Sequence, residues 1–172
     1  MSDHTKFLAA ARRVLSAEAD ALGVLSTQLG NSFGDAVETL LNTRGRIIVS
    51  GMGKSGHIAR KIAATFASTG TPAHFVHPAE ASHGDLGMIT SADAVIAISN
   101  SGEVPELANL VAYTRRFGIK LIGISSKERS SLAIQSDILL QLPQLGEACG
   151  TGIVPTTSVS YTHLTLPTIY SV

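Results

Sequence analysis

The stretch RIIVSGMGKSGHIARK, Arg46 to Lys61, joins a β-branched run to a glycine-rich turn and then to a helical pattern. A strand that leads through such a turn into a helix is the unit from which parallel sheets are built. The turn also contains G-x-G-x-x-G, typical of dinucleotide-binding turns, and GKS, typical of triphosphate-binding loops. This stretch therefore predicts a fold class and an anion site together.

Neither nucleotide pattern is complete. A triphosphate loop needs a glycine five residues before the glycine of GKS, and that position is Ile48, inside the strand. A dinucleotide site needs an acidic residue at the end of the second strand, but that strand ends in His77-Pro78 and Glu80 already lies in the loop. What remains is a turn whose glycines let backbone amides approach an anion at a helix N-terminus. A small phosphate is sufficient to occupy it.

The rest of the chain alternates helical and strand-like segments. We predict helices over most of the first 43 residues, including 35–41, and then over 55–69, 105–117 and 130–136. Short apolar runs predict strands at 46–51, 72–78, 92–99, 120–126 and 137–143. Most of these runs are continuously apolar, as buried parallel strands are.

This order of elements predicts an α/β fold. Right-handed crossovers place helices on both faces of the sheet, so we expect a three-layer α/β/α sandwich around a five-stranded parallel sheet, flavodoxin-like or Rossmann-like. We expect a helical segment at 1–44 that packs on a core at 45–158.

Composition excludes several classes of protein. Lys plus Arg and Asp plus Glu are both 13, no basic stripe is present, tryptophan is absent and aromatic residues are 5%, which argues against a nucleic-acid partner. The one cysteine, Cys149, excludes a disulfide within the chain and indicates a reducing compartment. No apolar run reaches about 18 residues, so no membrane span is expected. The N-terminus is not typical of a signal peptide. We expect a cytoplasmic protein.

Ligands of such sheets bind beyond the carboxyl ends of the strands. A second loop there, SNSGE, offers the hydroxyl groups of Ser99 and Ser101, with Gly102 for the turn and Pro105 in the first turn of the next helix. Together with the GMGKSG turn, this loop predicts a phosphate pocket without arginine. The alternative is that these serines only cap a helix.

Charged residues near these loops are candidates for chemistry. Lys54 is placed to reach a sugar hydroxyl or carbonyl, and the alternative is a solvated surface lysine. Glu103 and Glu106 begin a predicted helix, where the helix dipole alone favours acidic residues. Glu147 lies in a glycine-containing loop where no helix dipole explains it. A carboxylate near a phosphate pocket suits proton transfer beside a carbonyl.

Three histidines gather around the second strand: His74, His77 and His83. His74 and His77 are three apart on a predicted strand, so their side chains should point to opposite faces, and a three-histidine metal site is not expected. His77 and His83 are better explained as polar contacts to a ligand. Cys149 has no thiolate-stabilising motif and is expected to be a small packing residue.

The segments GMGKSG, FASTGTP, HGDLGM and SNSGE, in this order and spacing, resemble the SIS (sugar isomerase) domain of the arabinose 5-phosphate isomerase family. The resemblance runs from about residue 5 to residue 158. It implies a five-stranded parallel sheet between helices. It also implies interconversion of D-arabinose 5-phosphate and D-ribulose 5-phosphate for the Kdo sugar of lipopolysaccharide, without a metal or organic cofactor. Family members are homotetramers in which neighbouring subunits contribute to each active site.

The resemblance also implies roles for matching positions. It assigns catalytic relevance to Lys54, Glu106 and Glu147. It assigns substrate binding, with phosphate contacts from the serines, to Ser55, Gly70, Thr71, His77, His83, Ser99 and Ser101. His77 also matches a position that can touch an inhibitory zinc ion. In our hypothesis Glu147 or Glu106 moves a proton between C1 and C2 through a cis-enediol, and Lys54 stabilises oxyanion charge.

Past residue 158 the sequence departs from the resemblance. Family members continue with a helix rich in Leu, Ala and Met, then a catalytic histidine in an HPGG-like segment, and usually a pair of CBS domains. Residues 159–172, VSYTHLTLPTIYSV, lack helical periodicity and resemble a translated sequencing adapter, and the surroundings of His163 do not match the family histidine. We expect an N-terminal fragment with a foreign tail, one uncovered sheet face, poor solubility or assembly, and little isomerase activity.

Two other functions compete with this hypothesis. One is another SIS isomerase, acting on a hexulose or heptulose phosphate; the lysine of GMGKSG and the HGDLGM segment favour the pentose enzyme. The other is a sugar-phosphate sensor domain of a transcription regulator. Such regulators carry a helix-turn-helix domain before the SIS domain, and the first 43 residues are too short and not basic enough for one.

Overall fold

The computed structural model describes residues 3–148 and 156–165, with no side chains described for 163–165. Its centre is a sheet of parallel strands in the order β2-β1-β3-β4-β5. The strands are β1 (Ile47–Gly51), β2 (Ala73–Phe75), β3 (Ala94–Ile98), β4 (Lys120–Ser125) and β5 (Ile138–Gln141). The predicted five-stranded parallel sheet is confirmed. Each strand is shorter than its apolar run, because the runs continue into buried loop positions such as Val76, Ser99 and Leu142.

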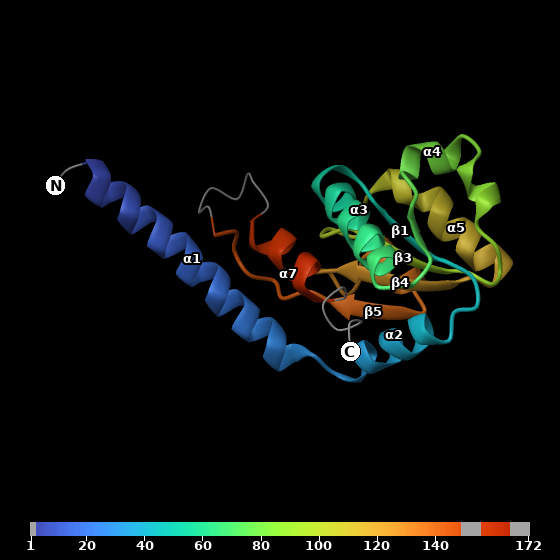
Figure 1. Ribbon diagram of the computed structural model, residues 1–172, viewed down its shortest axis with the longest axis horizontal. Helices are drawn as coiled ribbons and strands as arrows, with labels where there is room; N and C mark the ends of the chain where they lie inside the picture. Colours follow the sequence, from blue (N-terminus) through green and yellow to red (C-terminus); the bar gives the residue numbers. More distant parts are fainter. Residues whose placement is uncertain (1–2, 149–155, 166–172) are drawn as a thin grey trace.

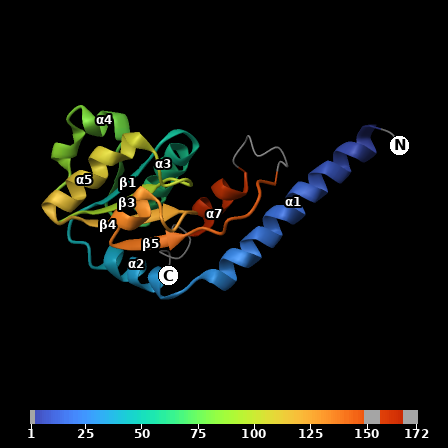
Figure 2. The same cartoon turned by 180° about the vertical axis from the view of Figure 1, so that it is seen from behind.

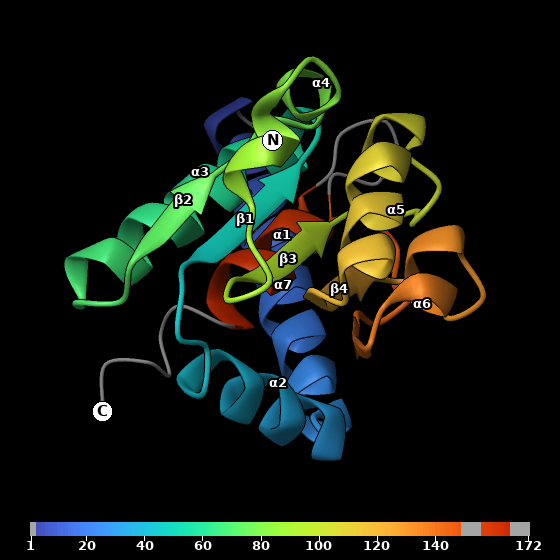
Figure 3. The same cartoon turned by 90° about the vertical axis from the view of Figure 1, so that its right-hand side faces the viewer.

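Helices cover both faces of the sheet, as predicted for a three-layer sandwich (Figures 1 and 3). One face carries α1 (Asp3–Gln28), α2 (Asn31–Leu41), α3 (Gly53–Ser68) and α7 (Thr157–Thr165). The other carries α4 (Pro78–Ser82), the 3₁₀ turns η1 (Asp85–Met88) and η2 (Pro105–Leu107), α5 (Ala108–Phe117) and α6 (Ser131–Gln135).

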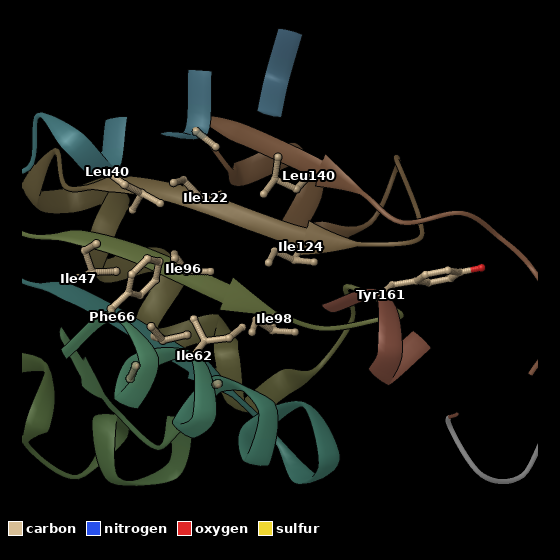
Figure 4. Packing of buried hydrophobic residues seen from close by; sticks show 14 of the residues in the cluster. Leu40, Ile47, Ile62, Phe66, Ile96, Ile98, Ile122, Ile124, Leu140 and Tyr161 are labelled. Carbon is tan, nitrogen blue, oxygen red and sulfur yellow. The ribbon is translucent and has the colours of Figure 1, made fainter. Parts of the chain in front are cut away.

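Alternation along the strands divides the core into two clusters. Ile47 and Val49 point to the α3 face, where Phe66 packs against them, whereas Ile48 points to the α5 face. All four residues are at most 1% exposed. Figure 4 shows the α3-face cluster between the sheet and its helices. Burial on both faces is the reason that the strand sequences are continuously apolar rather than alternating.

The strand order creates a switch point between β1 and β3. From β1 the chain crosses through α3 to β2 at one edge of the sheet, whereas from β3 it crosses through α5 to β4 on the other side. The two crossovers leave neighbouring strands in opposite directions, so a crevice opens at the carboxyl ends of β1 and β3. This is where the GMGKSG and SNSGE loops lie.

Two glycines shape the junction of β1 and α3, one through its backbone conformation and one through close packing. Gly53 has φ +56°, in the left-handed region that side chains disfavour. A Cβ on Gly56 would lie 2.7 Å from the carbonyl oxygen of Gly51, closer than a methyl group tolerates. The glycine pattern therefore serves tight packing of helix on strand as well as access to the backbone amides.

Helix α1 stands partly free of the rest of the chain (Figures 1 and 2). Its buried residues are Ala21 and Leu25, near its C-terminal end. Phe7, Leu8 and Leu15 are 69%, 58% and 69% exposed. These large apolar side chains in the first half of α1, defined here as the exposed apolar stripe, are therefore left mostly uncovered by the described residues of this single chain.

Helix α7 shows that the first part of 159–172 is helical, although the segment lacks helical periodicity as predicted. Residues 157–165 are helical, and Tyr161, 2% exposed, joins the α3-face cluster. The Oγ atom of Ser160 donates to the carboxylate of Glu18 in α1 at 3.1 Å. Figure 4 shows this helix beyond the carboxyl ends of the strands, with Tyr161 at the end of the cluster. We did not predict this helix because we relied on amphipathic periodicity, whereas packing and capping by distant residues stabilise this short helix.

Candidate functional site

A pocket of about 370 Å³ lies at the switch point, beyond the carboxyl ends of β1 and β3. Three segments form it: the start of α3, the SNSG loop after β3, and α7. The lining residues are Met52, Lys54, Ser55, Ile58, Ile98, Ser99, Asn100, Ser101, Val104, Ser158, Val159 and Thr162. The walls are mostly hydroxyl groups and apolar side chains, and Lys54 is the charged residue among them.

The first wall is the N-terminus of α3, which brings Lys54 and Ser55 to the pocket as predicted. The residue before this helix is Met52, whose side chain makes no capping hydrogen bond. The first N–H groups of a helix lack a carbonyl partner within the helix, and the helix dipole adds partial positive charge there. This end of α3 therefore offers backbone donors, the Ser55 hydroxyl and one ammonium group to an anion.

The second wall is the SNSG loop, which brings Ser99 and Ser101 to the same pocket. The Oγ atom of Ser99, a residue 2% exposed, accepts from the N–H of Gly102 at 3.0 Å. The Oγ atom of Ser101 accepts from the N–H of Glu103 at 3.3 Å. Both hydroxyls thus stabilise the turn, but neither caps a helix, because the N-cap residues that follow are Val104 and Leu107. Each accepts in these bonds, and a serine hydroxyl that accepts can still donate its proton.

Glu147 does not line the pocket but caps α7, the helix that forms the third wall. Its Oε2 atom accepts from the N–H of Thr156 at 2.6 Å, from the Thr156 hydroxyl at 3.1 Å and from the N–H of Ser158 at 3.4 Å. Burial opposes ionisation of this carboxyl, but these hydrogen bonds outweigh burial and lower its pKa. Our statement that no helix dipole explains Glu147 is wrong, because the carboxylate caps α7, a helix that we did not predict.

Glu106 and Glu103 lie close in sequence but have different surroundings. Glu106 is exposed on η2 and is not among the residues that line the pocket. The carboxylate of Glu103 bonds to Ser131 at the start of α6, on a different element from the helix that it precedes in sequence. The single chain therefore brings Lys54, Ser55, Ser99 and Ser101 together and leaves both glutamates outside the pocket lining.

Gly70 and Thr71 lie at the amino ends of the strands, on the opposite side of the sheet from the pocket. They follow α3 and precede β2, where the carbonyl of Pro72 accepts from the N–H of Ile47 at 2.9 Å at the amino end of β1. A residue at the amino edge cannot line a pocket at the carboxyl edge of the same sheet. Within this single chain, these two residues therefore do not share a pocket with Lys54 and Ser55.

The histidines also lie outside the pocket lining. The strand ends at Phe75, so His77 is not a strand residue and our argument from strand alternation does not apply to it. Instead, His77 is the N-cap of α4, and its Nδ1 atom accepts from the N–H of Ala79 at 3.3 Å. His83 ends the same helix and is exposed. The residues with described positions contain no group of three acidic, histidine or cysteine side chains suited to a metal. Cys149 and the side chain of His163 lie outside the described part.

Several lining residues were missed by sequence reasoning. Asn100 stands between the two predicted serines, and that position was a usable signal. Ser158, Val159 and Thr162 belong to α7, which we expected to be missing.

A larger cavity of about 500 Å³ lies at the amino ends of the strands, between α2 and the starts of β3 and β4, and is lined by none of the predicted residues. We favour the smaller pocket, because parallel sheets bind ligands at their carboxyl edge.

No helix among the residues described here is long and apolar enough to cross a membrane.

A model of the SIS domain matches residues 40–169, past residue 158, where we expected the family pattern to end. Arabinose 5-phosphate isomerase KdsD of Pseudomonas aeruginosa is 47% identical over 162 residues, covering 94% of this chain and 50% of that protein. KdsD of Yersinia pestis is 50% identical over 156 residues, covering 91% and 48%. The chain spans about half the length of these relatives.

Among solved structures, E. coli CFT073 c3406 in complex with arabinose 5-phosphate superposes with a TM-score of 0.90 at 36% identity. The match covers 99% of this chain and 88% of that chain. The domain model covers most of the chain, and both the sequence and the structural relatives agree with it. The resemblance of the four sequence motifs is thereby confirmed, and the chain belongs to the SIS domain family.

Proposed function

We propose that this chain is the sugar isomerase part of an aldose–ketose isomerase that interconverts D-arabinose 5-phosphate and D-ribulose 5-phosphate. The observation that carries the proposal is the switch-point pocket, where Lys54 and three predicted serines converge at a helix N-terminus. The KdsD relatives and the arabinose 5-phosphate complex of a structural relative support the same substrate. In this proposal the product enters Kdo and lipopolysaccharide synthesis in the cytoplasm.

Ser55, Ser99 and Ser101 hold the phosphate in this proposal, with the backbone amides at the start of α3. Lys54 then stabilises negative charge on the sugar oxygen as the enediol forms. A carboxylate removes the proton from one carbon and returns it to the neighbouring carbon, so no metal or organic cofactor is required. Glu147 is the first candidate for this base, because its carboxylate caps α7, the helix that forms one wall of the pocket. Glu106 is the alternative base.

We further propose that the chain works as a homo-oligomer, as a tetramer like its family. Gly70, Thr71, His77 and His83 lie outside the pocket lining of their own chain, so we assign them to contacts with the substrate of a neighbouring subunit. The exposed apolar stripe of α1 supports assembly, because a patch of large apolar side chains favours an interface. Contact of His77 with an inhibitory zinc ion belongs to the same proposal.

The experiment uses the chain with D-arabinose 5-phosphate in D₂O, followed by ¹H NMR. Proton transfer through an enediol incorporates deuterium at the sugar carbon, so exchange detects catalysis even at low turnover. We expect deuterium incorporation and ribulose 5-phosphate formation, both slowed about 10²- to 10³-fold in Lys54→Ala. Exchange with fructose 6-phosphate but not with arabinose 5-phosphate would identify a hexulose phosphate isomerase instead. Binding of arabinose 5-phosphate without any exchange would identify a sensor domain.

A further inference from the structure

The serine loop, defined here as Ser99–Glu103, is joined to the end of β4 by a hydrogen bond from the N–H of Ser99 to Ile124 and by the carbonyl group of Asn100. The carbonyl oxygen of Asn100 accepts three hydrogen bonds, from the N–H of Ser126 at 3.1 Å, the Ser126 hydroxyl at 2.8 Å and the Ser125 hydroxyl at 3.2 Å. Ser125 and Ser126 are 0% and 9% exposed. The residue between the two pocket serines is therefore fixed from the neighbouring strand end.

The same loop touches the start of α6. The carbonyl of Gly102 accepts from the N–H of Leu132 at 3.0 Å. Gly102 has φ +67°, and a Cβ there would overlap the side chain of Ser130, so the turn and α6 are in close contact. The N–H of Gly102 bonds back to Ser99. The geometry of the pocket serines therefore depends on where α6 begins.

A carboxylate closes this arrangement. Glu103 accepts two hydrogen bonds from Ser131, one from its N–H at 2.8 Å and one from its hydroxyl at 2.6 Å. Both bonds favour the ionised carboxyl, so the pKa of Glu103 is lowered. Bonds from two donors of one residue to the two oxygens of one carboxylate fix orientation as well as distance. Glu103 itself is not among the residues that line the pocket.

We propose that Glu103 and Ser131 are positioning residues that hold the serine loop in the geometry needed to bind the phosphate of the substrate. This inference rests on the proposed function and deepens it. Neither residue touches the substrate; they act through Gly102 and Asn100 on the orientation of Ser99 and Ser101. The polar face of the pocket is thus set by a contact between two surface residues on the α5 face of the sheet.

The first test needs no ligand. Amide hydrogen exchange of Leu132, whose N–H bonds to the carbonyl of Gly102, reports whether the serine loop stays docked on α6, and exchange of Gly102, whose N–H bonds to Ser99, reports whether the turn itself is kept. We expect Ser131→Ala and Glu103→Gln each to speed the exchange of Leu132 about tenfold, the effect of losing one charge-assisted hydrogen bond. Ser131→Thr keeps a hydroxyl group and should restore wild-type exchange. The matched control is Glu128→Gln, an exposed carboxylate in the same β4–α6 connection. Unchanged exchange in both test variants overturns the proposal.

The second test measures binding of inorganic phosphate and of D-arabinose 5-phosphate by calorimetry. Both dissociation constants should rise about tenfold in Ser131→Ala and Glu103→Gln and stay unchanged in Glu128→Gln. In turnover, KM should rise while kcat is kept. Faster exchange with unchanged phosphate affinity would reduce the pair to a structural role and overturn the positioning inference. Failure of the wild-type chain to bind either probe would contradict the proposed function itself.

Discussion

The Oε2 atom of Glu147 lies 2.6 Å from the backbone nitrogen of Thr156, the residue that precedes α7. This contact joins a loop after the last strand to the helix that forms one wall of the pocket. Burial of the phenol raises the pKa of Tyr161 in that helix, and the charge of Glu147 raises it further. Glu147 therefore stabilises the pocket wall in addition to its proposed catalytic role.

These two roles separate by substitution. Glu147→Gln keeps a carbonyl oxygen that can accept from the Thr156 N–H, so we expect the melting temperature to be nearly retained. The amide cannot accept the substrate proton. The isomerisation rate should fall about 10²- to 10⁴-fold. Glu147→Ala should in addition destabilise the fold by about 1 kcal/mol, the usual cost of losing a helix cap. Thermal melts and the deuterium-exchange assay measure the two effects. A rate close to wild type in Glu147→Gln would leave Glu106 as the base.

Lys54 is exposed at the start of α3 and lines the pocket. Lys54→Met removes the ammonium and keeps most of the side-chain volume, so we expect a loss of about 10²- to 10³-fold in kcat, typical of a removed oxyanion donor. The unfolding free energy should not change, since exposed side chains contribute little. Lys61→Met, an exposed lysine further along the same helix, is the matched control. Equal activity of both variants with wild type would mean that Lys54 is only a surface residue.

Gly56 packs α3 onto β1. A Cβ in Gly56→Ala would lie 2.7 Å from the Gly51 carbonyl oxygen, so we expect the variant to lose about 1–3 kcal/mol of unfolding free energy by overpacking. Displacement of the α3 N-terminus should also weaken phosphate binding. The control is Gly23→Ala in α1, where no atom lies within 4 Å of the new Cβ. Because alanine favours helix, this control should gain up to about 1 kcal/mol. Urea unfolding distinguishes the two, and an unaffected Gly56→Ala would mean that α3 can shift freely.

Asp93 predicts a dependence of stability on pH. Its side chain is 1% exposed, and although burial opposes ionisation, hydrogen bonds from Arg46 and Thr90 and the Arg46 charge lower its pKa. A carboxyl whose pKa is lowered by folding stabilises the fold above its unfolded pKa, about 4, and loses that contribution as the pH falls through the folded pKa.

Asp93→Asn should therefore cost about 1–3 kcal/mol at pH 7, and its difference from wild type should shrink below about pH 4. Urea unfolding between pH 2 and pH 7 measures this difference. Asp20→Asn, exposed on α1, should follow the wild-type profile throughout. A constant deficit of Asp93→Asn across the whole range would show that the deficit comes from packing rather than ionisation.

Local sequence patterns predicted most of the fold. Continuous apolar runs between helical segments predicted five buried parallel strands, because such strands need apolar residues on both faces. The glycines and hydroxyl residues that follow β1 and β3 predicted that these two loops form one pocket at the carboxyl ends of the strands. The structure has such a pocket, and it is lined by Lys54, Ser55, Ser99 and Ser101. These predictions succeeded because neighbours in sequence govern both burial pattern and turn chemistry.

Other features depend on residues far apart in sequence. Helix α7 lacks amphipathic periodicity and forms against α1 and α3, with a cap from Glu147. Glu103 binds Ser131 rather than the helix that it precedes, and Gly70 and Thr71 fall at the amino edge because α3 runs the full depth of the sheet. Side-chain hydrogen bonds and crossover length decide these contacts, and both are set only when the layers pack together.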